Sequence, residues 1–198
     1  SLLMEIILNK ISKNFGSTKV IDDFSFKFKK KSYAITGNNG AGKSTLLKLI
    51  GNLLSPTSGS INYNIKKNIN IPKNLFFAAP YQELISELSV KEFLKFHSRF
   101  KKLNSDYIKM LNTYNLIDYK NTKIGDLSSG SLQKLKLLIA FDSDSKFILL
   151  DEPTTNLDDE GKKIYKKLFR ENNKKKGIII ATNDSDDIIK KVTEIIKI

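Results

Sequence analysis

The 198-residue chain contains no cysteine and a single histidine, His97. Without cysteine it can form neither a disulfide nor a thiolate metal site, and cysteine nucleophiles are excluded. One histidine rules out a metal site built from two histidines of the same chain. A Ser-His-Asp triad would depend on His97, and no nucleophile-elbow pattern is present. His97 lies within a segment of helical periodicity, where we expect a surface or packing role.

Long apolar runs are also missing. The longest, residues 147–150 and 177–181, have the length of buried strands. They fall far short of the roughly 18 residues that a membrane-spanning helix needs. No cleavable signal pattern opens the chain. Because 40% of the residues are hydrophobic, enough for a sizeable core, we expect one compact cytoplasmic domain, or one domain with a small lobe.

Arginine is scarce: of 34 basic residues, only Arg99 and Arg170 are arginine. The formal net charge of +13 invites a nucleic-acid interpretation. However, arginine is the residue suited to bidentate recognition of phosphates and bases. The lysines are spread along the whole chain together with abundant isoleucine and asparagine, which is typical of AT-rich coding sequence. We therefore expect a solvated basic surface and no nucleic-acid partner.

Strand-like segments occupy both ends of the chain, and helical periodicity occupies the middle. Alternating or short apolar runs predict strands at residues 6–8, 24–28, 33–36, 61–65, 75–79, 147–150, 178–181 and 193–198. Helical patterns cover 44–52, 84–96 (one or two helices), 107–114, 132–139 and 161–172, and another begins at Ser185. Strands alternating with helices at both ends, with a helical insertion between them, predict an α/β fold.

A glycine-rich loop at residues 37–45, GNNGAGKST, fits the pattern G-x-x-x-x-G-K-[ST] between a predicted strand and a predicted helix. Glycines let successive backbone N–H groups curl round a polyphosphate, and the helix N-terminus adds partial positive charge. In this pattern Lys43 reaches the β- and γ-phosphates and Ser44 ligates Mg²⁺. The alternative is a glycine turn that merely caps a helix. The predicted nucleotide-binding residues are Asn38, Asn39, Gly40, Ala41, Gly42, Lys43, Ser44 and Thr45.

The apolar run at residues 147–150 ends in two carboxylates, Asp151 and Glu152. A strand that is apolar throughout must be buried, so its acidic end emerges at the carboxyl edge of the sheet, where ligands bind in open α/β folds. Asp151 is predicted to hold Mg²⁺ through water, and Glu152 is the candidate that polarises the attacking water. Many strands end in acidic residues, so the prediction depends on the glycine loop as well.

These motifs and their order resemble the nucleotide-binding domain of ABC (ATP-binding cassette) proteins over about residues 5–198. Residues 127–131, LSSGS, resemble the family's signature loop, with Ser129 in place of the first glycine and Ser131 in place of the final glutamine. Ser128 and the N–H of Gly130 form an anion site at a helix N-terminus. The resemblance implies that this site serves the ATP held by the opposite subunit. Taken alone, the same sequence is typical of a helix N-cap.

The resemblance also implies a fold. It is a P-loop NTPase core with a mixed β-sheet, an antiparallel β subdomain and an inserted helical subdomain. Residues 1–198 would form a single nucleotide-binding domain. Its ATPase core would comprise about 1–81 and 144–198, and its helical subdomain about 82–143.

Three further residues match family positions. Gln82, at the start of the helical segment, matches the glutamine loop, which senses Mg²⁺ and couples ATP to the transmembrane partner. Residues 156–158 resemble the D-loop, with Asp158 implied to contact the other subunit. Phe15 lies where the family stacks an aromatic ring on adenine, although a core phenylalanine would fit the sequence as well.

One departure concerns the position after the strand at residues 178–181. The family normally carries a histidine there that hydrogen-bonds the γ-phosphate, whereas this chain has Asn183. Asparagine keeps a neutral donor but cannot hold a proton or a positive charge. We therefore expect slow but real ATP hydrolysis that depends on Glu152.

The resemblance implies the ATP-hydrolysing subunit of a membrane transporter. Two copies would sandwich two Mg-ATP and drive separately encoded transmembrane subunits, which would hold the chain at the inner face of the membrane.

Other ABC ATPases share these motifs. Chromosome and DNA-repair ATPases carry a long coiled coil between the glycine loop and the signature, but only 85 residues separate Lys43 from Ser128. Ribosome-associated ATPases carry two cassettes in one chain, and this chain has one. A regulatory subunit that hardly hydrolyses ATP is a further alternative, motivated by Asn183.

Overall fold

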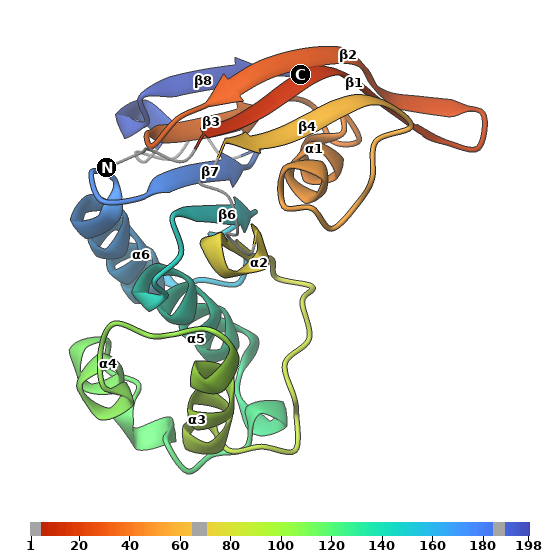
Figure 1. The fold of residues 1–198 in the computed structure, drawn as a ribbon. Helices are drawn as coiled ribbons and strands as arrows, with labels where there is room; N and C mark the ends of the chain where they lie inside the picture. The colour runs from red at the N-terminus through yellow and green to blue at the C-terminus, as the bar shows by residue number, and fades with distance from the viewer. Residues whose placement is uncertain (1–4, 65–70, 184–188) are drawn as a thin grey trace. The chain divides into compact units, whose positions relative to one another are not determined.

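The computed structural model describes residues 5–64, 71–183 and 189–198, which fall into two compact units (Figure 1). The first unit comprises Ser1–Phe77, Ser145–Glu152 and Asn173–Ile198, and the second Ala78–Asp144 and Pro153–Asn172. In the described ranges, no helix has both the length and the apolar character needed to cross a bilayer. The helix predicted from Ser185 starts outside the described residues, and the predicted subdomain boundaries stay a prediction.

An antiparallel sheet in the first unit has the strand order β2-β1-β4. Its strands are β1 (Glu5–Phe15), β2 (Thr18–Phe28) and β4 (Ser58–Asn64). The sequence predicted only 6–8 and 24–28 as strand in the first two, because the remainder is polar and lacks strict alternation. Register shifts interrupt the β1–β2 pairing, and Lys10 and Asp23 have positive φ. These irregularities break the period-two pattern on which the prediction depended.

The second sheet has the order β5-β6-β7-β3-β8. It contains β3 (Ser32–Thr36), β5 (Leu75–Ala78), β6 (Phe147–Asp151), β7 (Gly177–Ala181) and β8 (Glu194–Lys197). The pairs β6–β7, β7–β3 and β3–β8 are parallel. Every residue of β6 and β7 is buried, which explains their continuous apolar sequences.

One hydrophobic core joins both sheets to helix α1 (Lys43–Ile50). The apolar face of α1 packs into it through Leu46, Leu47, Leu49 and Ile50. Figure 1 shows α1 beneath the antiparallel sheet. The helix follows the glycine loop directly, so core packing holds the loop's C-terminal end in place. The short helix α2 (Ile71–Asn74) precedes β5 and was not predicted.

The second unit is helical. It contains α3 (Val90–Phe100), α4 (Tyr107–Thr113), α5 (Ser129–Asp142) and α6 (Asp159–Asn172), with 3₁₀ turns η1 (Ile117–Tyr119) and η2 (Ile124–Asp126). The helices predicted at 107–114, 132–139 and 161–172 are confirmed. A parallel sheet, an antiparallel sheet and a helical segment confirm the predicted fold class.

The helix predicted over residues 84–96 was wrong in its first part. Residues 84–89 form turns and extended backbone, and α3 begins only at Val90. Ser89 accepts a hydrogen bond from the backbone N–H of Glu92, and the Glu92 carboxylate accepts one from the Ser89 N–H. This capping box fixes the start of α3 at Val90. Leu84 and Leu88 therefore lie outside the helix despite their helical spacing.

Candidate nucleotide-binding site

Three neighbouring strands bring the predicted residues of the first unit to one edge of the parallel sheet. In the register, Ala181 of β7 pairs with Asp151 of β6 on one side and with Ile35 of β3 on the other. Because the strands are parallel, the glycine loop after β3, the carboxylates at the end of β6 and the residues after β7 lie at the same carboxyl edge. This is where ligands bind in open α/β sheets.

The glycine loop is shaped by left-handed backbone. Gly40 has φ +83° and Gly42 has φ +96°, conformations that side-chain-bearing residues rarely adopt. A Cβ on Gly42 would also come within 2.9 Å of the Val20 side chain. Gly42 is the N-cap of α1 and offers no side-chain acceptor, so nothing on the cap competes for the N–H groups of the first helical turn. Such N–H groups bind anions.

Lys43 supplies a buried positive charge to the same loop. Its side chain is only 6% exposed, and its Nζ donates to the carbonyls of Gly37 (3.1 Å) and Asn38 (3.0 Å). The ammonium group therefore lies against the inner carbonyls of the loop. A turn that merely capped a helix would need no buried ammonium, so the geometry favours the phosphate-binding interpretation.

Ser44 and Asp151 place two oxygen atoms side by side. The Ser44 hydroxyl donates to Asp151 Oδ1 at 2.9 Å, and Asp151 is only 2% exposed. Hydroxyl and carboxylate oxygens are the ligands that Mg²⁺ takes in phosphate sites, usually with several waters retained. The residues present therefore fit the predicted Mg²⁺ site.

Glu152 is held in an uncommon backbone conformation. Its φ is +42°, and its N–H donates to the carbonyl of Ala181 at 2.8 Å. Oε2 accepts hydrogen bonds from the Thr182 hydroxyl (3.0 Å) and from the Asn183 N–H (3.5 Å). Strained backbone of this kind clusters at functional sites. Thr182 and Asn183, which follow β7, therefore orient the Glu152 carboxylate.

Thr182 is a residue that the sequence analysis missed as a participant. It is 3% exposed and donates directly to the candidate base. In the sequence, Thr182 is marked by its position directly after a buried strand. That position points to Glu152 only when β7 is known to pair with β6.

Asn183 contacts the glycine loop. Its side-chain Nδ2 donates to Oδ1 of Asn39. The asparagine at the position of the family's histidine therefore contacts both the glycine loop and the candidate base, and its role toward the γ-phosphate stays a prediction. His97 belongs to α3 in the second unit, where its ring lies 5.8 Å from that of Phe93 and burial lowers its pKa. Its packing role is confirmed.

Phe15 lies at the end of β1 and is 49% exposed. The alternative that it is a core residue is therefore wrong. The Lys13 ammonium lies 5.3 Å from the ring centroid, which is within the range of a cation–π contact. Adenine stacking on this ring stays a prediction.

The predicted signature loop begins helix α5 in the second unit. Ser128 is the N-cap, and its hydroxyl oxygen accepts from the Ser131 N–H at 3.1 Å. A Cβ on Gly130 would lie 3.0 Å from the carbonyl of Asn156. The signature loop and the D-loop segment are therefore neighbours, and the close approach explains why a glycine is present.

Asp158 serves as a helix cap. Its Oδ1 accepts from the Gly161 N–H at 2.7 Å at the start of α6, and it forms an ion pair with Lys134 at 3.1 Å. The backbone N–H of Gly161, and after it the side-chain ammonium of Lys134, donate hydrogen bonds that lower the pKa of Asp158. Its contact with another subunit stays a prediction.

Gln82 is exposed and lies in a turn, where its N–H donates to the carbonyl of Ala79 at 3.2 Å. The sequence had suggested that Gln82 opens a helical segment, and the structure shows that it does not. Gln82, Ser128 and Asp158 all belong to the second unit, while the glycine loop, Asp151, Glu152 and Asn183 belong to the first.

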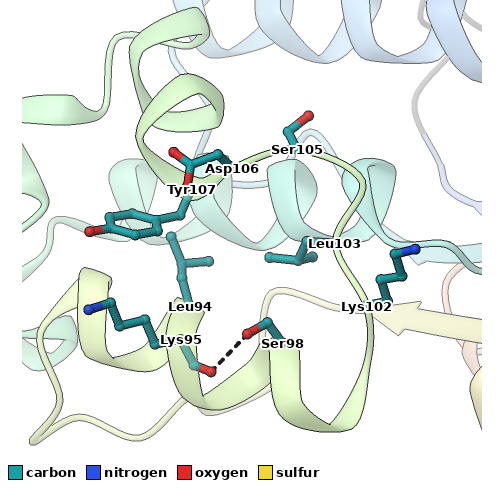
Figure 2. Close-up of a pocket in the computed structure, with 8 residues that line it drawn as sticks. All are labelled: Leu94, Lys95, Ser98, Lys102, Leu103, Ser105, Asp106 and Tyr107. Carbon is teal, nitrogen blue, oxygen red and sulfur yellow. Dashed lines mark hydrogen bonds between the residues drawn. The ribbon is translucent and has the colours of Figure 1, made fainter.

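A pocket of about 210 Å³ lies in the second unit between α3 and α4 (Figure 2). Three of its polar side chains are engaged within the unit. The Ser98 hydroxyl donates to the Lys95 carbonyl, the Ser105 hydroxyl donates to Asp142, and Asp106 caps α4. None of the predicted site residues lines it. The lining residues are Leu94, Lys95, Ser98, Lys102, Leu103, Ser105, Asp106 and Tyr107.

Comparison with known proteins gives a family. Residues 21–155 match the family model described as ABC transporter. The chain is 30% identical over 190 residues to the uncharacterized ABC transporter ATP-binding protein YybJ of Bacillus subtilis, covering 92% of this chain and 87% of that protein. It is also 30% identical to rat ATP-binding cassette sub-family A member 2 over 92% of its own length, but it spans only 7% of that protein.

Solved structures share the fold. The bacterial ABC transporter cassette MJ0796, in a structure described as dimeric, matches with a TM-score of 0.79 at 22% identity over 98% of this chain and 94% of that one. A second structure of the same cassette is described as a dimeric post-hydrolysis state bound to ADP and Pi. It matches with a TM-score of 0.74 at 23% identity, covering 90% and 88% of the two chains.

Proposed function

This chain belongs to the ABC transporter family, and from that premise we propose that it is the ATP-binding and ATP-hydrolysing subunit of a membrane transporter. The observation that carries the proposal is the convergence of Lys43, Ser44, Asp151 and Glu152 at the carboxyl edge of one sheet. Two of these side chains touch each other, and a third is buried inside the loop that would enclose the phosphates.

The glycine loop binds the triphosphate in this proposal. The N–H groups at the start of α1 lie at the positive end of the helix dipole, and Lys43 adds a full positive charge. Lys43 exchanges its two carbonyl acceptors for phosphate oxygens, which are stronger partners for an ammonium group. Phe15, exposed at the end of β1, stacks on the adenine.

Ser44 and Asp151 hold Mg²⁺, Asp151 through water, and Gln82 of the second unit is a further candidate ligand. When bound between these residues, Mg²⁺ would supply positive charge that offsets the negative charge of the phosphates. The Ser44–Asp151 hydrogen bond supports this assignment because it places the two candidate Mg²⁺ ligands next to each other.

Glu152 polarises the attacking water. The water oxygen forms a bond to the γ-phosphorus while the bond to the β–γ bridging oxygen breaks, and ADP and phosphate leave. Thr182 and the Asn183 N–H orient the carboxylate. The Asn183 side chain is a neutral donor beside the phosphate site and carries no charge. We expect slow turnover for this reason.

A second copy completes the site. The N-terminus of its α5, with Ser128 and Gly130, faces the γ-phosphate, and its Asp158 lies near the interface. The dimeric MJ0796 structures, one of them with ADP and Pi, support this arrangement. Separately encoded transmembrane subunits would receive the motion and would hold the chain at the inner face of the membrane.

The competing functions differ in observable ways. Among the described residues between Lys43 and Ser128, the longest helix is the 11-residue α3. A chromosome-type ATPase would need a long coiled coil there, so the structure favours transport. A regulatory subunit would bind ATP and hardly hydrolyse it even with its membrane partner present.

The test is to measure ATP affinity and phosphate release for the purified chain with Mg²⁺. Glu152→Gln should leave ATP affinity within about threefold and lower phosphate release about a hundredfold, since general bases contribute about 10²–10⁴ in rate. Glu194→Gln, at an exposed position on β8, is the matched control and should change neither. Equal hydrolysis by Glu152→Gln would refute its assignment as the base, and no measurable ATP binding by the parent chain would refute the proposed function.

A further inference from the structure

Helix α5 carries a buried lysine. Lys136 is only 4% exposed, and burial lowers its pKa. A buried ammonium group is costly unless its donors are satisfied. Its Nζ donates to the carbonyl of Pro80 at 2.7 Å and to that of Ala79 at 3.3 Å. The charge is therefore directed at two consecutive backbone carbonyls of a segment 56 and 57 residues earlier in the chain.

Those carbonyls directly precede Gln82. The Ala79 carbonyl also accepts from the Gln82 N–H at 3.2 Å. One oxygen thus receives a donor from α5 and a donor from the residue that we propose as a Mg²⁺ ligand. Gln82 itself lies outside any helix or strand, and its N–H closes the turn that begins at Ala79.

The same helix holds two other segments of the second unit. Gln133, 3% exposed, donates through Nε2 to the carbonyl of Pro153 at 3.0 Å. Lys134 pairs with Asp158. The helix that begins at the signature loop therefore holds the segment before Gln82, the segment that follows Glu152 and the D-loop segment. Its residues 133–136 are a common support for these three segments.

We propose that Lys136 is a positioning residue that fixes the segment 79–82 to helix α5 and so sets the position of Gln82 relative to the signature loop. This inference rests on the proposed function for its effect on hydrolysis. The contact itself does not depend on that function. A hydrophobic residue of similar length would fill the same space, but it would leave the Pro80 carbonyl without this donor.

The test compares Lys136→Met with Lys136→Arg and with Lys109→Met, an exposed lysine of α4 that serves as the matched control. Lys136→Met keeps approximately the length of the side chain and removes the donor to the Pro80 and Ala79 carbonyls, and a melting temperature measured beside the kinetics separates a local effect from a loss of overall stability. It should lower kcat for ATP hydrolysis about tenfold, while ATP affinity stays within about twofold, because the phosphate-binding loop lies in the first unit. Lys136→Arg should recover most of kcat, since a guanidinium can donate to both carbonyls.

Hydrogen exchange gives a readout that needs no ATP. In Lys136→Met, the backbone amides of residues 81–83 should exchange at least about tenfold faster than in the parent chain, while those of α5 and α6 keep their rates. A merely structural role would instead raise exchange throughout the second unit and lower the melting temperature. Unchanged exchange at 81–83, or unchanged kcat in an active parent, would overturn the proposal. If the parent binds no ATP, the proposed function fails while the exchange result still decides whether Lys136 holds this segment.

Discussion

Helices α1 and α5 begin in opposite ways, although both N-termini are proposed to face the same kind of phosphate. Gly42 caps α1 with no side chain and leaves the first-turn N–H groups without a side-chain acceptor. Ser128 caps α5 with its own hydroxyl, which accepts from the Ser131 N–H. One helix start therefore remains available to an anion, while the other is stabilised internally and binds an anion only by sharing its donors.

This difference corresponds to two proposed tasks, which are nucleotide binding at the start of α1 and closure of the interface between two copies at the start of α5. The α1 terminus combines first-turn N–H groups that no cap side chain occupies with the buried Lys43, and in the proposed function it holds the phosphates within one chain. The α5 terminus has no lysine or arginine in its first turn, and its cap is already satisfied. A weaker site of this kind suits an interface that must form and release, whereas the loop before α1 suits nucleotide binding by a single copy.

Removing the charge from the first site should have the largest effect. Lys43→Ala should weaken ATP binding about a hundredfold, because a charge-assisted hydrogen bond to phosphate is lost in a buried setting. The measurement is a nucleotide titration at fixed Mg²⁺. Lys48→Ala, in the last turn of the same helix, is the control and should bind ATP normally. Equal affinities in the two variants would remove Lys43 from the site.

Adding a methyl group to the cap of α1 should have the next largest effect. Gly42→Ala meets both a positive φ and the Val20 side chain, whereas Gly40→Ala meets a positive φ and open space. We expect Gly42→Ala to lower the free energy of unfolding by about 2–3 kcal/mol and Gly40→Ala by about 1 kcal/mol. Urea unfolding without nucleotide measures both. If the two variants lost the same stability, the close approach to Val20 would carry no cost.

Removing the cap of α5 should cost less. Ser128→Ala should lower the free energy of unfolding by about 1 kcal/mol, because the Ser131 N–H loses its acceptor. Ser129→Ala, at the exposed first position of the helix, should cost almost nothing. Thermal unfolding of the two variants compares them directly. A larger loss in Ser129→Ala would show that the capping hydroxyl is not the one identified.

The smallest expected effect is a pH dependence of the free energy of unfolding, because the start of α6 is capped by the Asp158 carboxylate. The folded chain lowers the pKa of Asp158 below its ordinary value of 3.8. The cap therefore contributes stability above about pH 4, and the contribution is lost as pH falls through the lowered folded-state pKa. Unfolding of the parent and of Asp158→Asn should differ at pH 7 and converge in acid. Asp159→Asn, one residue later, is the control and should not show this convergence.

Sequence reasoning succeeded where a motif is local. The glycine loop, the strand at 147–150 and the helix start at Ser128 were each predicted within a few residues, because each depends on contiguous residues. It failed at 84–89, where apolar residues at helical spacing were taken for a helix. There the capping box of Ser89 and Glu92 outweighed the spacing. It also missed most of the β1–β2 hairpin, whose outer half is polar and irregular.

The sequence by itself determined the chemistry of the loop. The glycines, Lys43 and Ser44 lie within one short stretch, so their N–H groups, charge and hydroxyl can reach a phosphate together in any fold that places a helix after them. Only the tertiary structure decided which groups meet across long separations. Thr182 reaches Glu152 over 30 residues, Asn183 reaches Asn39 over 144, and Lys136 reaches Ala79 over 57. These contacts follow from strand order and from the burial of α5, because two chain segments are brought together by packing and leave no local periodicity in either one.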